Sequence, residues 1–370
     1  MSQRLGGYGA GDVEPREDFV RALVFRGPWE LAVEERPDPV AGPGEVIVGV
    51  VSTGICGSDI HGFTGENGRR FPGQVMGHET VGRVAAVGPD VSGPPVGTLV
   101  TVHPVLACGV CASCRSGLDY RCPDKRIIGV DPAYSSAFAE LMAVPAANVV
   151  PLPEDMPAEY GALVEPLAVG QHAVTRGGCV PGDRVLVVGG GPIGQACALA
   201  ARRLGAGGLV VSEPHAGRRA LLADVGVATV DPTAGDPKAG DPALSSGVAD
   251  TLGGPPSLVV DAVGSSRSLS DALTVCAPGE RVVLVGMHEP QVSIPAYGVS
   301  IEERSLIGSY CYTADHFRDT AAWVATAPPE LARLVEGRVG LAEAPTAFEA
   351  LAKGTDGASK VLVFPGDTSS

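Results

Sequence analysis

The chain has 370 residues, of which 45% are hydrophobic and only 5% aromatic, and its formal net charge is −15. This length accommodates two domains, each with its own core of aliphatic side chains. The negative charge repels phosphate backbones and anionic lipid headgroups, which excludes nucleic acids and membrane surfaces as expected partners and favours a small neutral or cationic substrate. No apolar stretch reaches the roughly 18 residues of a membrane span, and the N-terminus lacks signal-peptide order, so we expect a cytoplasmic protein.

The first half of the chain has two parts that differ in composition and sequence pattern. Residues 1–18 are polar and rich in glycine, which predicts a disordered extension. From residue 19 to residue 165, short β-type runs such as Glu45-Val-Ile-Val-Gly-Val-Val alternate with Gly/Pro turns. This alternation is typical of a compact, mostly β domain with barrel-like strands.

Residues 166–304 repeat the order strand, Gly-rich turn and helix, as where Arg184-Val-Leu-Val-Val leads into helix-forming sequence. The repeat predicts a doubly wound parallel sheet of the Rossmann type and makes the chain an α/β protein. Residues 231–256 are rich in Gly, Pro, Asp and Ser, so we predict a surface loop in which any helix is short. The last segment, 305–370, ends in strand-like sequence and is assigned to the first domain.

Four of the nine cysteines crowd together, at Cys108, Cys111, Cys114 and Cys122. In a reducing compartment, such crowding favours a metal over disulfides. Four thiolates close a tetrahedral shell around Zn²⁺, so this set predicts a structural zinc site without an open coordination position. An iron–sulfur site or free thiols are the alternatives.

A second set of candidate ligands is spread along the chain, in the runs Cys56-Gly-Ser58-Asp-Ile-His61, His78-Glu79 and Val-Glu165-Pro-Leu-Ala. Cysteine, histidine and glutamate side chains all bind zinc, and three protein ligands leave a fourth position for water or a substrate oxygen. Each piece is weak alone, because a Gly-His-Glu run is more often a turn. Their order in one chain predicts a catalytic zinc site.

The third signal is a Gly-rich turn, Val187-Val-Gly-Gly-Gly-Pro-Ile-Gly, which follows a strand and opens a helix. This context is the one a dinucleotide site requires, because glycines let the backbone approach a pyrophosphate and the helix N-terminus favours its charge. Glu213 ends the next strand, about 20 residues on, where an acid would take the ribose hydroxyls of NAD and repel the extra phosphate of NADP. We predict NAD binding at Gly189, Gly191, Pro192, Ile193, Gly194, Glu213 and Arg218, the last of which softens that repulsion in part.

In this order, the three sets of residues resemble the zinc-containing medium-chain alcohol dehydrogenases. The resemblance runs from about residue 20 to residue 364. Within it, Leu163-Val-Glu-Pro-Leu-Ala-Val and Ile307-Gly-Ser-Tyr-Cys-Tyr-Thr are similar to the branch of 2,3-butanediol dehydrogenase and sorbitol dehydrogenase. The resemblance implies a GroES-like catalytic domain beside the Rossmann domain, two zinc ions per subunit, NAD, and a homodimer or homotetramer.

The resemblance also implies a role for each ligand. Cys56 and His78 match the catalytic zinc ligands, and Glu165 stands where polyol enzymes have a glutamate. Glu79 matches a carboxylate behind the ligands that enters the zinc shell in some relatives, so which glutamate completes the shell stays open. Cys108, Cys111, Cys114 and Cys122 match the structural zinc lobe.

Two further residues match a proton relay. Ser58 corresponds to the hydroxyl that passes the alcohol proton onward, and His61 to a more exposed histidine of the same path. In the alternative interpretation, Ser58 and Asp59 only cap a helix. Tyr310 and Tyr312 are candidates to line the pocket at the domain junction.

The predicted activity is hydride transfer between NAD and a secondary alcohol, such as a diol, a polyol or a sugar-like substrate, and its ketone. L-Threonine 3-dehydrogenase and the aminocyclitol dehydrogenases are alternatives with a similar arrangement of zinc and NAD. A zinc-free quinone reductase or a non-catalytic relative is less favoured, because neither would keep both sets of ligands.

Overall fold

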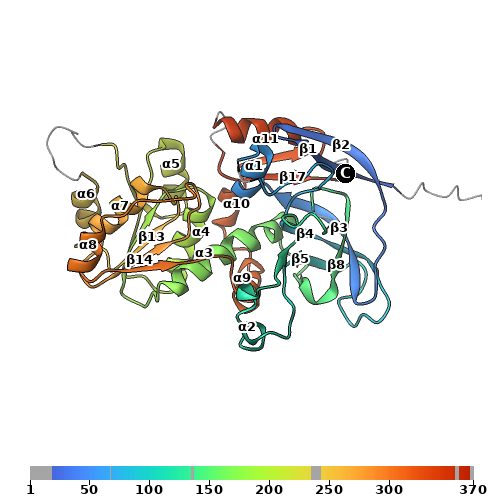
Figure 1. The fold of residues 1–370 in the computed structure, drawn as a ribbon, viewed down its shortest axis with the longest axis horizontal. Helices are drawn as coiled ribbons and strands as arrows, with labels where there is room; N and C mark the ends of the chain where they lie inside the picture. Colours follow the sequence, from blue (N-terminus) through green and yellow to red (C-terminus); the bar gives the residue numbers. More distant parts are fainter. Residues whose placement is uncertain (1–18, 67, 135–136, 235–242, 355–357, 367–370) are drawn as a thin grey trace, which may run out of the picture.

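The computed structural model describes residues 19–66, 68–134, 137–234, 243–354 and 358–366. The predicted disordered extension, residues 1–18, lies outside them. Figure 1 shows two regions side by side, one around β13 and β14 and the other around β3, β4 and β5, with helices α3, α9 and α10 between them. The fold is α/β, as predicted from the sequence.

A seven-stranded sheet carries the mostly β region. Its order is β16-β17-β3-β4-β5-β9, with β8 also paired to β3. Alternate residues of β3, Val46, Val48 and Val50, are buried in one core cluster, as expected for a strand with one face on a core. The strands of this region, including the two-stranded pairs β1–β2 and β6–β7, are β1 (Phe19–Gly27), β2 (Glu30–Pro37), β3 (Glu45–Gly54), β4 (Glu79–Val87), β5 (Leu99–Val102), β6 (Val105–Leu106), β7 (Arg126–Ile127), β8 (Leu141–Pro145), β9 (Val149–Pro151), β16 (Gly337–Gly340) and β17 (Val361–Phe364).

A six-stranded sheet carries the second region, in the order β12-β11-β10-β13-β14-β15 with every pair parallel. Its central strands are continuous aliphatic runs that are buried on both faces, because helices cover a parallel sheet on both sides. The strands are β10 (Arg184–Val188), β11 (Gly208–Ser212), β12 (Ala228–Val230), β13 (Leu258–Asp261), β14 (Arg281–Leu284) and β15 (Ser305–Gly308).

The helices follow these strands or join the two sheets. The α-helices are α1 (Gly57–Thr64), α2 (Ala112–Arg115), α3 (Val164–Arg176), α4 (Pro192–Arg203), α5 (Ala216–Asp224), α6 (Ala243–Leu252), α7 (Ser266–Val275), α8 (Ala296–Ile301), α9 (Ala314–Val324), α10 (Leu331–Leu334) and α11 (Ala344–Lys353), and the 3₁₀ helices are η1 (Asp119–Arg121), η2 (Ala146–Asn148) and η3 (Ala158–Leu163). None of the helices in the described ranges is long and apolar enough to cross a membrane.

Two predictions about segments need correction. The domain boundary at residue 305 is misplaced, because β15 pairs with β14 in the six-stranded sheet. A strand of four residues carries no local sign of the sheet it joins, so only the pairing reveals it. The predicted surface loop at 231–256 contains the ten-residue helix α6, which contacts β11 and has its own Val248 completely buried.

One buried cluster spans both regions and holds them together. It includes Leu99 of β5, Leu167 of α3 and Leu199 of α4. Burial of side chains of this size contributes about 1.5–3 kcal/mol each. The helix α3 therefore has a firm position between the two sheets, and Glu165 lies in its first turn.

Candidate active site

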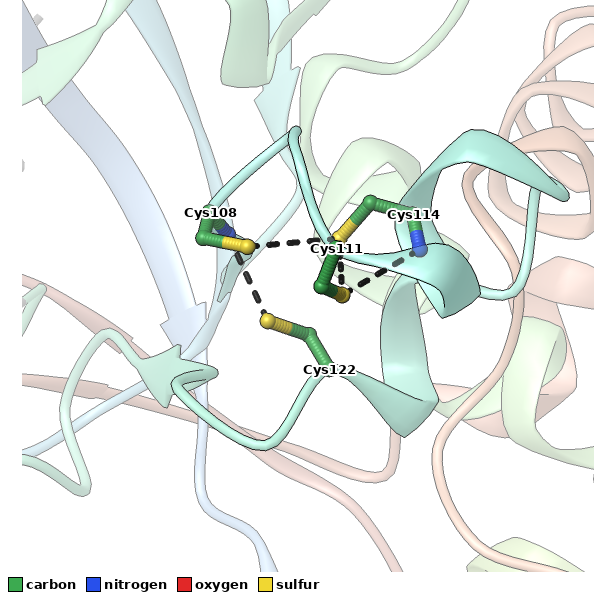
Figure 2. Close-up of side chains that lie close together, drawn as sticks. All are labelled: Cys108, Cys111, Cys114 and Cys122. Carbon is green, nitrogen blue, oxygen red and sulfur yellow. Dashed lines mark hydrogen bonds between the residues drawn. The ribbon is translucent and has the colours of Figure 1, made fainter.

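The four clustered cysteines come together at the start of a short lobe formed by α2 and η1. Figure 2 shows their side chains turned toward a common centre. The sulfur of Cys114 lies 3.4 Å from that of Cys111 and 3.9 Å from that of Cys108, and Cys122 completes a set whose sulfurs all lie within 4.8 Å of one another. Sulfurs bound tetrahedrally to one zinc ion at 2.3 Å would be about 3.8 Å apart, so the set fits zinc.

Backbone groups of the same lobe favour the thiolate form that zinc requires. Hydrogen bonds from the backbone of Val110 and Cys111 lower the pKa of Cys108 to about 7. The backbone N–H of Cys114 also donates to the Cys111 sulfur, at 3.5 Å. The thiolate is the metal-binding form of cysteine. Cys114 differs from Cys108, because burial and the Cys111 side chain raise its pKa to about 12.

A second group of donors consists of Cys56, His78 and Glu79, whose ligand atoms lie within 4.8 Å of one another. Cys56 is the residue before α1, and the other two stand where the chain enters β4. Gly77 makes this entry possible with φ +108°, a backbone conformation that other residues rarely adopt. The structure therefore unites residues that are more than twenty positions apart, and it groups Glu79, rather than Glu165, with Cys56 and His78.

The ring of His78 tests whether this group fits a metal. The side chain is buried, and its Nδ1 has no hydrogen-bond partner among the described residues. Asp59 Oδ1 lies 3.6 Å from that nitrogen and also forms an ion pair with Arg70 Nη2, at 3.4 Å. Because the Asp59 carboxylate faces Nδ1, the other ring nitrogen is the one on the side of Cys56, and a carboxylate orients metal-binding histidines in this way. The donor set of thiol, imidazole and carboxylate fits Zn²⁺.

Lys360 forms an ion pair with Glu79, and this contact was not predicted from the sequence. Its ammonium group lies 2.6 Å and 2.7 Å from the two Glu79 oxygens and donates to the carbonyl of Ile55 at 3.2 Å. Although burial opposes the charged form, Glu79 and then Cys56 raise the pKa of Lys360. The only sequence signal is a lysine directly before a strand-like aliphatic run.

Glu165 is held by a different partner. The Tyr312 hydroxyl donates to Glu165 Oε1 at 2.8 Å, and both side chains are buried. Burial raises the pKa of Glu165 to about 7, although the positive charge of His78 opposes this shift. Tyr312 therefore faces a candidate ligand, whereas Tyr310 is 43% exposed and lines a cavity at the carboxyl ends of β14 and β15.

The predicted relay residues both lie on α1. Ser58 is in the first turn with a buried hydroxyl oxygen, two residues after Cys56. His61 lies further along, and its Nδ1 is 2.7 Å from Glu66 Oε2 in an exposed pair. The capping role falls to Asp59, which accepts a hydrogen bond from the Cys56 N–H at 3.3 Å. Ser58 is thus not needed as the cap.

The Gly-rich turn joins β10 to α4 in the arrangement expected for a dinucleotide. Gly189 has φ +93°, and a Cβ on Gly194 would come within 1.8 Å of the Gly189 carbonyl oxygen. A Cβ on Gly191 would meet only Arg218, at 4.0 Å, so the surface above this glycine is open. Pro192 and Ile193 begin α4, whose N-terminus points at this surface. A helix N-terminus favours negative charge, so the surface suits a pyrophosphate.

Glu213 follows β11 and reaches back to the same turn. Its carboxylate accepts hydrogen bonds from Gly190 N–H and His215 N–H, both at 2.7 Å, and Arg218 lies 3.9 Å from it. Each carboxylate oxygen can accept more than one hydrogen bond, so these contacts leave capacity for hydroxyl groups.

Two clusters that fit zinc, beside a parallel nucleotide-type sheet, indicate an oxidoreductase of the dehydrogenase class. Sequence models of known families agree: the alcohol dehydrogenase GroES-like domain matches residues 42–154, and the zinc-binding dehydrogenase family matches residues 192–326. The chain belongs to the zinc-binding alcohol dehydrogenases, as its motifs predicted.

Individual relatives show how far the similarity extends. L-Galactonate-5-dehydrogenase of Escherichia coli (strain K12) is 31% identical over 80% of this chain and 85% of its own length. L-Threonine 3-dehydrogenase of Pyrococcus abyssi (strain GE5 / Orsay) is 36% identical over 75% of this chain and 78% of its own. The crystal structure of 2R,3R-butanediol dehydrogenase from Bacillus subtilis matches with a TM-score of 0.83 and 26% identity, covering 94% of this chain and 100% of the other.

Proposed function

We propose that the chain oxidises a secondary alcohol, a diol, polyol or sugar-like compound, to its ketone with NAD, and catalyses the reverse reaction. The observation that carries this proposal is the convergence of Cys56, His78 and Glu79 next to Glu165, at the junction with the nucleotide-type sheet. Relatives that act on galactonate and on butanediol support it.

Each group of site residues has its own role. Cys56 and His78 hold a catalytic zinc ion, with Glu79 or Glu165 as the third ligand. Lys360 and Tyr312 hold these two glutamates in place, while the four-cysteine lobe holds a structural zinc ion. When bound, zinc supplies Lewis acidity and NAD accepts the hydride. The protein orients the two reactants and excludes water.

Glu213 supports the choice of NAD over NADP. Its carboxylate lies at the end of β11 beside the Gly-rich turn, where it can accept hydrogen bonds from ribose hydroxyls and repels a phosphate. Arg218, at 3.9 Å from Glu213, reduces this repulsion without removing it.

A substrate screen tests the function. We expect the purified protein to reduce NAD with vicinal diols or sugar alcohols, and to give a lower kcat/KM with NADP for the same alcohol. Absence of reduction with every diol, polyol, sugar acid, aminocyclitol and threonine in the screen would contradict the proposed activity. Equal kcat/KM with both cofactors would contradict the role of Glu213.

Threonine oxidation is the second candidate. The relative from Pyrococcus abyssi that carries this activity is the more similar of the two reported by sequence identity, at 36%. The threonine arm of the screen separates the two functions, because threonine carries an ammonium group beside the reacting hydroxyl and a polyol does not.

Ser58 is assigned to proton transfer, with His61 further along the path to solvent. We expect Ser58→Ala to lower kcat about a hundredfold or more, the usual scale for a general acid–base group. Zinc content and NAD affinity should stay near normal, and His61→Ala should do less. Thr64→Ala, which removes a hydroxyl at the far end of the same helix, is the control. An unchanged kcat in Ser58→Ala, with hydride transfer shown to be rate-limiting by deuterated substrate, would count against the relay.

Association of two copies is supported by the edge of the six-stranded sheet. In the described part of the chain, β15 pairs only with β14, and Leu306 of β15 is exposed. An unpaired edge with apolar neighbours is a template for pairing with another chain. None of the nine cysteines, all of which are described, forms a disulfide, which supports a reducing compartment such as the cytoplasm.

A further inference from the structure

Arg70 has its side chain almost completely buried beside the candidate zinc ligands. The side chain is 1% exposed, and among the described residues the acid that pairs with it is Asp59, at 3.4 Å between Nη2 and Oδ1. Asp59 lies on α1 and is fully buried. Arginine is almost never fully buried unless it is paired, so Asp59 accounts for the position of Arg70. None of the sequence motifs includes this arginine.

The helix α1 has room for the arginine because it carries a glycine at Gly62. A Cβ on Gly62 would lie 2.6 Å from Arg70 Cγ and 3.0 Å from its Nε. Gly62 and Asp59 share one face of α1, as residues three apart do, so the arginine crosses this face to reach Asp59. Arg70 Nη1 also donates to the carbonyl of Arg69 at 3.3 Å, whereas its buried Nε has no partner in the described part of the chain.

The partner of Arg70 contacts two candidate zinc ligands. Asp59 Oδ2 accepts the backbone N–H of Cys56 at 3.3 Å, and Oδ1 lies 3.6 Å from His78 Nδ1. The oxygen that faces His78 is the same one that faces Arg70, so a guanidinium group and an imidazole ring share it. A carboxylate behind a metal-binding histidine orients the ring and raises its basicity as a ligand. The charge on Asp59 therefore acts on the metal position through His78.

Two buried carboxylates lie near this metal position, and each has a buried cation of its own. Lys360 Nζ lies 2.6 Å and 2.7 Å from the two Glu79 oxygens, and Arg70 faces Asp59. A buried carboxylate without a counter-charge is unfavourable, so the two cations balance the two acids. The excess of negative charge at the metal position is therefore lower than the number of nearby acids indicates.

We propose that Arg70 is a positioning residue of the catalytic zinc site, which holds Asp59 and balances its charge so that His78 is a weaker electron donor to the metal. The inference rests on the proposed dehydrogenase function and adds a residue to that site. Zinc assists the reaction as a Lewis acid, and more basic ligands weaken this effect. Arg70 therefore lets the substrate alcohol lose its proton at a lower pH.

Arg70→Gln tests the charge, because it removes the positive charge and keeps an amide that can donate to Asp59. The quantity measured is the pH midpoint, at which kcat/KM for oxidation of one alcohol reaches half of its plateau. We expect the midpoint to rise by about one pH unit, the scale of one neighbouring charge, with the plateau at high pH largely kept. A contact that is only structural would lower kcat/KM at every pH and leave the midpoint in place.

Further variants separate charge from fit. Arg70→Lys keeps a positive charge, so its midpoint should return toward that of the unmodified enzyme. Asp59→Asn/Arg70→Gln leaves no unpaired buried ion, so it should fold even if Arg70→Gln does not, and its midpoint should stay close to that of the unmodified enzyme. Arg36→Gln is the matched control, because Arg36 Nη2 contacts the same loop at the carbonyl of Gly73, at 3.5 Å, and should leave the midpoint unchanged.

A second readout does not depend on activity. With cobalt(II) in place of zinc, unpaired electrons displace the ring N–H proton resonance of a metal-bound histidine far from the other resonances. Of the two donor groups, only the one with Cys56 contains a histidine, so this resonance reports His78 alone. We expect it to move in Arg70→Gln and to return toward its original position in Arg70→Lys.

The outcomes distinguish the role of Arg70 from the activity itself. An unmoved midpoint or an unmoved resonance in Arg70→Gln would overturn the proposed role of Arg70. A midpoint in the double variant that is raised by a full pH unit would also overturn it, because no charge is then left unbalanced. If the unmodified enzyme oxidised no alcohol, the proposed function would fail instead, and the resonance would still decide whether Arg70 acts on His78.

Discussion

Cys56→Ser is expected to remove alcohol oxidation while the protein stays folded. A hydroxyl group is a far weaker zinc ligand than a thiolate, and loss of several kcal/mol of Lewis-acid stabilisation corresponds to a rate loss of about a thousandfold or more. Folding should survive because Cys56 is the N-cap residue of α1, and serine is among the preferred residues at that position.

Three measurements on the variant separate loss of the metal from loss of the fold. Zinc content should fall from two ions per chain to one, while the circular dichroism spectrum and the thermal midpoint stay close to those of the unmodified protein. Cys179→Ser removes a thiol outside both clusters and should keep both zinc ions and the activity. Full activity in Cys56→Ser would show that Cys56 does not hold the catalytic metal.

The parts of the site that the sequence predicted are those with local spacing. The four cysteines lie within one short lobe, and the Gly-rich turn lies between a strand and a helix that are adjacent in the chain. In both places the residues that act together are close in sequence, so their spacing already restricts their geometry. Ser58 and His61 also lie close together, on α1, and their role in proton transfer stays a prediction.

The parts that the sequence did not predict depend on long-range contacts. Lys360 lies 281 positions from Glu79, and Tyr312 lies 147 positions from Glu165, so no local pattern links either pair. The sequence treated Tyr310 and Tyr312 alike as possible pocket residues. In the structure, one lines an open cavity and the other is buried against a candidate ligand.

The net charge did not reveal a local group of cations. It describes the long-range field, whereas Arg121 and Arg176, which are 55 positions apart, line the same cavity at the carboxyl ends of β14 and β15. The ring of Tyr120 contacts His172 of α3 with centroids 4.7 Å apart, which ties η1 to this helix. The position of Arg121 thus depends on the order of the four-cysteine lobe.

Cys111→Ser is expected to lower the stability of the protein. A structural zinc ion contributes on the order of 10 kcal/mol to ordering its site, so loss of one of four thiolates should remove one zinc ion per chain and lower the thermal midpoint by several degrees. Ser113→Ala, a change within the same short helix that spares every ligand, should leave both quantities unchanged.

The catalytic zinc ion, which we propose is held by Cys56 and His78, should stay bound in Cys111→Ser. Zinc analysis and the thermal midpoint of the same preparation measure the loss of the structural ion and its effect on stability. Two zinc ions per chain in Cys111→Ser with an unchanged thermal midpoint, or a single zinc ion in the unmodified enzyme at full activity, would contradict the structural role of the lobe.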